Sequence, residues 1–308
     1  MFFDLLFIVL GVYLVLKGAD WLTEGASSLA RRMNISEMVI GLTIVAAGTS
    51  APELFVSFVS ALKGTPDMAV GNVVGSNIMN TMLIVGCAAV VAPMTISRPT
   101  VRKDIPFAIG ASLLMLLLCQ SGGLSRLAGI VLLAAFAAFM FLSFKTAPSP
   151  SEAPTFNIQS SIFNSITRVL LGLAMLVVGS NVFVDHASDL ALSLGISEGV
   201  VGLTVVAGGT SLPELATTVV AARKGQSAMA IGNVLGSNVF NILLILGLTA
   251  AISPLAIEGI TMVDMAVMLL SVVLLWLFCR TRYTVERWEG FTLVAAYLAY
   301  LIWLIMNL

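Results

Sequence analysis

A 56-residue segment occurs twice in this chain, and each copy holds one glutamate, Glu53 or Glu214, within an uncharged apolar stretch. Residues 41–96 return without gaps as residues 202–257, shifted by 161 positions, and about 30 of the aligned positions are identical. The identities are concentrated in glycine, threonine, serine, proline, glutamate and asparagine. A lipid-facing helix needs only apolar side chains, so we infer that these residues serve close packing or ligand binding.

The composition predicts an all-α integral membrane protein. Hydrophobic residues make up 59% of the chain, charged residues only 10%, and the mean hydropathy is +1.05. A soluble domain carries about 25% charged residues. The surroundings are therefore a lipid bilayer, and no basic run indicates a nucleic acid partner. The apolar start lacks a positively charged leader region, so it is interpreted as a first span and not a removable signal peptide.

Ten apolar segments of about 20 residues are long enough to cross a bilayer. They are expected at 3–24, 38–62, 68–94, 104–121, 124–144, 164–190, 199–222, 228–253, 261–279 and 287–306. The polar, proline-rich stretch at 145–163 is predicted to be a short cytoplasmic linker. It separates a first five-helix repeat, 1–144, from a second, 164–308.

Charge placement predicts the orientation, because lysine and arginine in short loops stay on the cytoplasmic side. Alternate connections hold most of these residues: Arg31, Arg32, Arg98, Arg102, Lys103, Lys145, Arg168, Arg223, Lys224, Arg280, Arg282 and Arg287. Both termini are therefore expected outside. Five spans is an odd number, so the second repeat should enter the membrane in the opposite orientation. His186, the only histidine, is expected in a solvated external loop.

The two glutamates need compensation at membrane depth. A charged residue there costs roughly 2.5–3.5 kcal/mol on insertion scales. Residues 41–62 and 202–222 contain no lysine, arginine or histidine before Lys63 and Arg223, so neither segment supplies a cationic partner. A proton, a residue on another helix or a bound cation would each serve.

Oxygen donors surround both glutamates. Pro52 and Pro213 lack an amide hydrogen, so they free backbone carbonyls one turn earlier. Hydroxyl and amide side chains follow in both copies: Thr49, Ser50, Thr210, Ser211, Ser76, Asn80, Ser237 and Asn241. Such oxygen-rich sites suit Ca²⁺ and Na⁺ and disfavour zinc, copper and iron. Four further asparagines either join the site or hydrogen-bond to neighbouring helices: Asn72, Asn77, Asn233 and Asn238.

The paired motifs GTSAPE and GTSLPE, with GNVVGSN and GNVLGSN, resemble those of the cation/calcium exchanger superfamily, specifically the prokaryotic sodium/calcium exchangers, or calcium/sodium antiporters. The resemblance covers nearly the whole chain and implies that the protein lies in a prokaryotic inner membrane. It implies ten helices around a cluster of four cation sites. Carried over by motif, the ligands are Glu53, Glu214, the hydroxyls of Thr49, Ser50, Thr210, Ser211, Ser76 and Ser237, and the carbonyls of Ala46 and Ala207, with Asn80 and Asn241 at the remaining paired position.

The function implied by the resemblance is exchange of Na⁺ for Ca²⁺ by alternating access, without a cofactor and without enzymatic activity. Some relatives carry aspartate at the position of Asn241, and its absence here argues against potassium co-transport. The alternative is proton/calcium exchange at the same glutamates, although proton-coupled relatives tend to have histidine in these motifs. A membrane-embedded hydrolase is a remote alternative, because no arginine, lysine or aspartate pair accompanies the carboxylates. No protein partner is evident.

Overall fold

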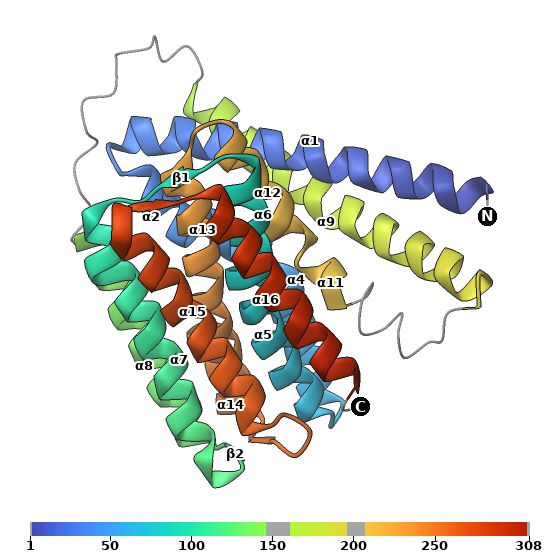
Figure 1. The fold of residues 1–308 in the computed structure, drawn as a ribbon, viewed down its shortest axis with the longest axis vertical. Coiled ribbons are helices and arrows are strands. Elements are labelled where there is room, and N and C mark those ends of the chain that lie inside the picture. The colour runs from blue at the N-terminus through green and yellow to red at the C-terminus, as the bar shows by residue number, and fades with distance from the viewer. Residues whose placement is uncertain (1, 146–160, 196–206, 307–308) are drawn as a thin grey trace.

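The computed structural model describes residues 2–145, 161–195 and 207–306, and most of them are helical. Figure 1 shows long helices crossing the molecule side by side, with short breaks inside several of them. The first half contains α1 (Phe2–Met33), α2 (Glu37–Ile40), η1 (Gly41–Val45), α3 (Ala46–Thr49), α4 (Ala51–Leu62), α5 (Pro66–Met79), η2 (Asn80–Ile84), α6 (Val85–Val91), β1 (Met94–Thr95), η3 (Thr100–Asp104), α7 (Ile105–Leu118), η4 (Cys119–Ser121), β2 (Gly123–Leu124) and α8 (Arg126–Lys145).

The second half repeats much of this succession. It contains α9 (Ile162–Ser193), α11 (Ala207–Thr210), α12 (Leu212–Arg223), α13 (Ser227–Val239), η6 (Phe240–Leu246), α14 (Gly247–Ile252), β3 (Leu255–Ala256), α15 (Met262–Arg282), β4 (Thr284–Val285) and α16 (Arg287–Met306). The segments η1, η2, η3 and η6 are π-helical turns inside longer helices. Such turns are frequent near functional sites. The predicted linker at 145–163 lies almost entirely outside the described residues.

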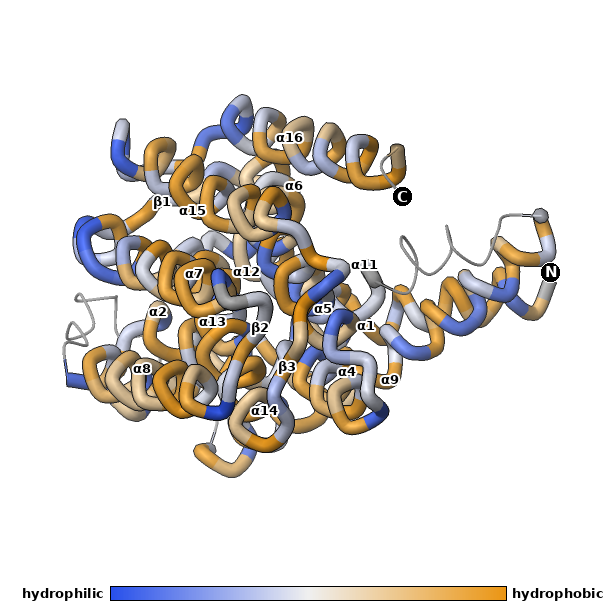
Figure 2. The backbone as a smooth tube through the Cα atoms, turned by 90° about the horizontal axis from the view of Figure 1, so that it is seen from below, coloured by the Kyte–Doolittle hydropathy of each residue, from blue (hydrophilic) through white to orange (hydrophobic). Residues whose placement is uncertain are grey.

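Seven described helices are long and apolar enough to cross a membrane, and the bent unit from α2 to α4 adds an eighth. The span expected at 104–121 is helical and consists mainly of α7, with the π-helical η3 extending the helix before it. The start of the span expected at 199–222 lies outside the described residues. Figure 2 shows hydrophobic residues dominating the helices. The chain is thus a mostly helical integral membrane protein.

The helices α1 and α9 form an antiparallel pair that extends beyond the rest of the molecule (Figure 1). Each is 32 residues long, several residues more than the predicted spans. Glycines bring the two backbones together: a Cβ on Gly11 would lie 2.8 Å from the carbonyl oxygen of Gly179, and one on Gly18 would lie 2.7 Å from that of Gly172. The expectation of a loop at His186 is wrong, because α9 continues through it to Ser193.

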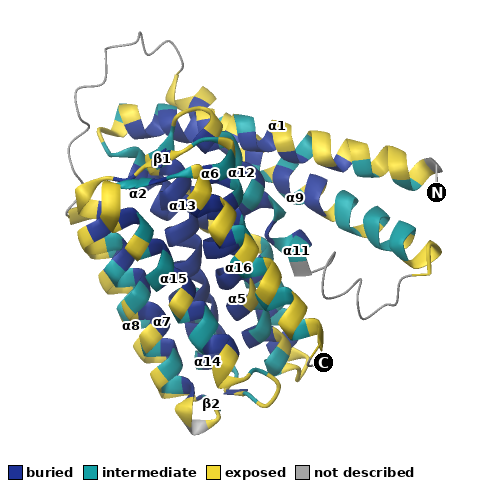
Figure 3. Ribbon diagram, in the orientation of Figure 1, coloured by how far each residue is buried: buried dark blue, intermediate teal, exposed yellow. Residues whose placement is uncertain are grey.

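The centre of the fold is formed by the continuous units α5–η2–α6 and α13–η6–α14. In each, 78% of the most apolar window is buried, compared with 28% for α1 and α9. Figure 3 shows the buried residues gathered on these central helices and the exposed ones on the outer helices. Gly41 and Gly232 let η1 and α13 touch, since a Cβ on Gly232 would lie 2.7 Å from the Met38 carbonyl oxygen. The central helices therefore hold the site segments of both copies against each other.

Short strands that the sequence did not predict join the two halves. β1 pairs antiparallel with β4, and β2 pairs antiparallel with β3. Each strand has two residues and lies in a connection between helices. Each pairing joins one strand from the first half to one from the second, so backbone hydrogen bonds tie the repeats together outside the helices.

Candidate functional site

The helix preceding each glutamate is broken at a serine. Ser50 separates α3 from α4 with φ −83° and ψ 8°, and Ser211 separates α11 from α12 with φ −92° and ψ 8°. Pro52 and Pro213 lie in the first turn after each break, where a missing amide hydrogen leaves no hydrogen bond unmade. The bend between α3 and α4 is 48°. The sequence thus ends one helix and starts the next inside the apolar region.

Glu53 and Glu214 lie in the first turns of the helices that follow these breaks. Each is only 1% exposed. The free amide hydrogens at a helix N-terminus favour negative charge by about 0.3–1 kcal/mol, and more where the site is partly buried. The break therefore places each carboxylate at the end of a helix that stabilises its charge.

The two repeats exchange hydrogen bonds at the glutamates. The Ser50 hydroxyl donates to Glu214 Oε1 at 3.1 Å, and the Ser211 hydroxyl lies 3.1 Å from Glu53 Oε1 in the matching arrangement. Ser211 Oγ also lies 3.3 Å from the Ser76 hydroxyl. Each carboxylate is therefore oriented by the broken helix of the other repeat, and Ser76 joins the same cluster.

Asparagines of the two repeats form a second reciprocal pair of hydrogen bonds. Asn80 Nδ2 donates to Asn238 Oδ1 at 3.1 Å, and Asn241 Nδ2 donates to Asn77 Oδ1 at 3.0 Å. The acceptors are fixed in turn, because Asn77 Nδ2 donates to the Asn238 carbonyl and Asn238 Nδ2 donates to the Thr81 hydroxyl. With their amide nitrogens committed, Asn80 and Asn241 have their Oδ1 atoms available for another ligand.

Several buried oxygens of the predicted ligand set have no hydrogen-bond partner among the described residues. They are Glu53 Oε2, Glu214 Oε2, Asn80 Oδ1, Asn241 Oδ1 and Ser237 Oγ. A buried polar group without a partner is costly. Cations can satisfy carboxylate, amide and hydroxyl oxygens of this kind, and this donor set fits Ca²⁺ and Na⁺.

The other predicted ligands are placed less directly. The Thr49 hydroxyl donates to Asn233 Oδ1 at 3.1 Å. The Ala46 carbonyl accepts the Ser50 amide hydrogen at 2.9 Å, so it is engaged within its own helix. Thr210 is half-buried beside the second break, and Ala207 begins α11.

The hydroxyls of Ser57 and Thr218, which lie close to the backbone of the two glutamates, were not predicted from the sequence. Asn72 Nδ2 donates to the Glu53 carbonyl at 3.2 Å and to Ser57 Oγ at 2.9 Å. Asn233 Nδ2 likewise lies 3.5 Å from the backbone carbonyl of the second glutamate and 3.0 Å from Thr218 Oγ1. Ser57 and Thr218 occupy equivalent positions four residues after each glutamate, and this repeated hydroxyl was the available signal.

Both the fold and the paired motifs have counterparts among known proteins. A family model described as sodium/calcium exchanger protein matches residues 3–145 and 164–306. The putative antiporter CaxA of Alkalimonas amylolytica is 36% identical over 96% of each chain, and the inner membrane protein YrbG of Escherichia coli is 38% identical over 89% of this chain and 88% of its own. A structure of the sodium-calcium exchanger NCX_Mj, soaked with Na⁺ and Ca²⁺, has a TM-score of 0.86 at 33% identity, covering 96% of this chain and 97% of that one.

The chain is an integral membrane transporter, as its buried carboxylates in a helical membrane fold indicate. It belongs to the sodium/calcium exchanger family, as the motifs predicted. Proteins of this family are cation/calcium antiporters rather than enzymes, and they move ions without a cofactor.

Proposed function

We propose that this chain exchanges Na⁺ for Ca²⁺ by alternating access at a site built on Glu53 and Glu214. The observation that carries the proposal is the crossed pair of hydrogen bonds, in which each broken helix orients the carboxylate of the other repeat. One oxygen of each carboxylate is buried without a hydrogen-bond partner among the described residues, as are the amide oxygens of Asn80 and Asn241. These oxygens offer a shared coordination sphere, and the asparagines act as direct ligands in it.

The architecture we propose has ten spans in two inverted five-helix repeats, 1–144 and 164–308, with both termini outside. The matching succession of elements in the two halves supports it. In such a repeat the midplane site opens to each side in turn. The relative in Escherichia coli is named an inner membrane protein, which supports the same location here.

Charge counting gives the expected energetics. Two glutamates balance one Ca²⁺, whereas three Na⁺ leave the loaded site with one positive charge, so exchange is electrogenic. A tenfold Na⁺ gradient supplies about 1.4 kcal/mol per ion, or about 4.2 kcal/mol for three ions. One net charge across 100 mV adds about 2.3 kcal/mol. The sum, about 6.5 kcal/mol, sustains a Ca²⁺ ratio of more than about four decades.

Movement of α1 and α9 provides the alternating access in this proposal. The glycine contacts join these helices into one unit, and most of their surface faces away from the core. Sliding of this unit across the broken helices α4 and α12 would uncover the site first to one side and then to the other.

The test is uptake of radioactive Ca²⁺ into proteoliposomes loaded with Na⁺, with K⁺-loaded and acid-loaded vesicles in parallel. An outward Na⁺ gradient should drive uptake, and Glu53→Gln and Glu214→Gln should each abolish it. Glu258→Gln, at an exposed glutamate, is the matched control and should retain the flux. Uptake driven by the proton gradient alone would replace this proposal with proton/calcium exchange at the same glutamates. Retained flux in either buried variant would refute the assignment of the site.

A further inference from the structure

A second group of potential metal ligands lies at the far end of the α1–α9 pair. The antiparallel contacts run in heptad steps: Gly25 meets Ser165, Gly18 meets Gly172, and Gly11 meets Gly179. One heptad further along the same line, Asp4 of α1 faces His186 of α9. The glycines fix the spacing of the two backbones, so they also fix the distance at which these two side chains meet.

The His186 ring is held in place on two sides. It stacks on Phe7, with ring centroids 4.5 Å apart and planes 9° from parallel. Its Nδ1 atom lies 3.2 Å from Asp4 Oδ1, and the two side chains are 28% and 21% exposed. Asp189 follows three residues after the histidine on the same helix, so it shares the same face. These contacts hold an imidazole nitrogen towards the carboxylate of the neighbouring helix.

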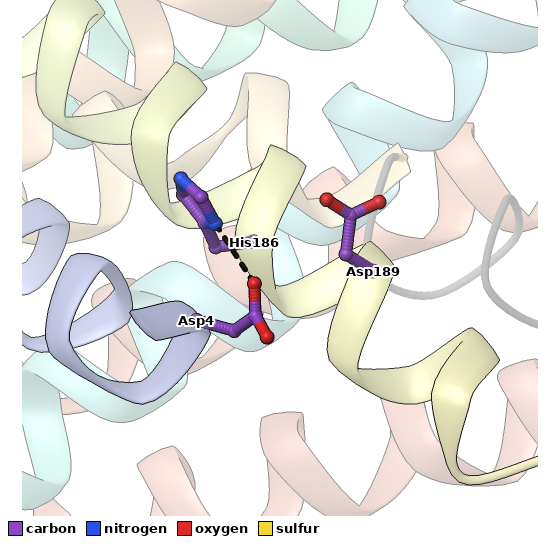
Figure 4. Close-up of side chains that lie close together, drawn as sticks. All are labelled: Asp4, His186 and Asp189. Carbon is purple, nitrogen blue, oxygen red and sulfur yellow. Dashed lines mark hydrogen bonds and ion pairs between the residues drawn. The ribbon is translucent and has the colours of Figure 1, made fainter. Parts of the chain in front are cut away.

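The three side chains lie close together, with Asp4 and His186 in contact and Asp189 to one side (Figure 4). One nitrogen of His186 and one carboxylate oxygen each of Asp4 and Asp189 lie within 4.8 Å of one another. Bonds of about 2.0–2.2 Å to a central Zn²⁺ would hold two ligands at most about 4 Å apart. Asp189 is exposed and has no ion pair among the described residues, so rotation of its side chain can close the difference.

We propose that Asp4, His186 and Asp189 bind a transition-metal dication of the Zn²⁺ class. Imidazole nitrogen combined with carboxylate oxygen is a donor set that suits Zn²⁺, whereas Ca²⁺ and Mg²⁺ favour oxygen alone. Two carboxylates and one imidazole supply three ligands, and water completes the coordination. The site differs from the transport site in its donors, since the transport site offers only oxygens, and it links the two helices α1 and α9.

The experiment measures Zn²⁺ binding to the purified full-length protein by isothermal titration calorimetry in saturating Na⁺. His186→Ala and Asp189→Asn are the test variants, and Asp185→Asn is the matched control, since Asp185 is an exposed aspartate outside the group. Glu53→Gln removes a carboxylate of the proposed transport site, so it shows whether Zn²⁺ binds there instead. Ca²⁺ exchange by the His186→Ala protein verifies that it is folded.

We expect one Zn²⁺ per chain, an affinity at least tenfold weaker in the two test variants, and no change in Asp185→Asn or Glu53→Gln. Binding that survives His186→Ala, or that disappears only with Glu53→Gln, would overturn the proposal. An equal loss of binding in Asp185→Asn would also overturn it, because general negative charge would then account for the binding.

Discussion

Replacing Lys224 with methionine should shift the exchanger towards the conformation open on the cytoplasmic side. Lys224 follows α12 at the end predicted to be cytoplasmic, and it contacts α1. Its Nζ lies 2.9 Å from Asp20 Oδ1 and 3.5 Å from Glu24 Oε1, and it donates to the Thr23 hydroxyl at 3.1 Å. These contacts hold the α1–α9 unit against the core on that side, so sliding must break them.

The structure gives the size of the effect. The three charged side chains are 28%, 41% and 48% exposed, so each ion pair contributes about 0.2–1 kcal/mol. The hydrogen bond to the threonine adds about 0.5–1.5 kcal/mol at most. A combined loss of about 1–3.5 kcal/mol changes an equilibrium by roughly 5–300-fold. Lys224→Met should change the ratio of the two conformations by that factor.

The inverted repeat proposed above predicts an opposite effect at the equivalent lysine. Lys63 stands 161 positions before Lys224, and Asp185 stands 161 positions after Glu24. Both are exposed, and neither has an ion pair among the described residues. Sliding that separates the pairs of Lys224 would bring Lys63 towards Asp185, so Lys63→Met should favour the state that is closed on the cytoplasmic side.

Distances between spin labels at Leu16 of α1 and Leu127 of α8, both exposed, would report the two states. Arg223→Gln is the control, because it removes the neighbouring positive charge without removing an ion pair seen among the described residues. If Lys224→Met leaves the distance distribution the same as in the control, the contacts do not hold α1 and the reasoning is wrong.

Two further predictions concern packing and ion binding. Gly18→Ala should lower the melting temperature, because its Cβ would lie 2.7 Å from a backbone carbonyl, and overpacking of this kind costs about 1–3 kcal/mol. Gly110→Ala should leave the melting temperature unchanged, because a Cβ at Gly110 would meet no atom within 4 Å. Equal melting temperatures of the two variants would contradict the close-packing argument. Calcium at roughly one hundred times its Kd should stabilise the protein by about 2.7 kcal/mol, and chelation should remove the effect. In thermal unfolding Asn241→Leu should reduce this gain, and an unchanged gain would exclude the amide oxygen as a ligand.

The sequence allowed the fold class and family to be predicted because the constraints on them are local. Spans depend on length and apolarity, and the breaks at Pro52 and Pro213 depend on a missing amide hydrogen. The helix ends were less predictable. α1 was expected to end at residue 24 and continues to Met33, because helical hydrogen bonding does not stop at the membrane surface.

Partners across the repeats could not be predicted from spacing. The donation from Ser50 to Glu214 joins residues 164 positions apart, and that from Ser211 to Glu53 joins residues 158 apart. Motif spacing identifies which residues share a helix face, but the partner on the other helix depends on how the two broken helices pack. For the same reason the π-helical turns and the two-residue strands became apparent only in the structure.

The crossed hydrogen bonds also bear on how such a chain could have arisen. A single half would hold a carboxylate without the serine that orients it. In the inverted architecture proposed above, two identical halves would assemble the complete site with one copy inserted upside down relative to the other. In that architecture a gene encoding one half would produce a dual-topology dimer, and fusion after duplication would fix the two orientations permanently. The sequence differences between residues 41–96 and 202–257 would then reflect two halves that no longer exchange places.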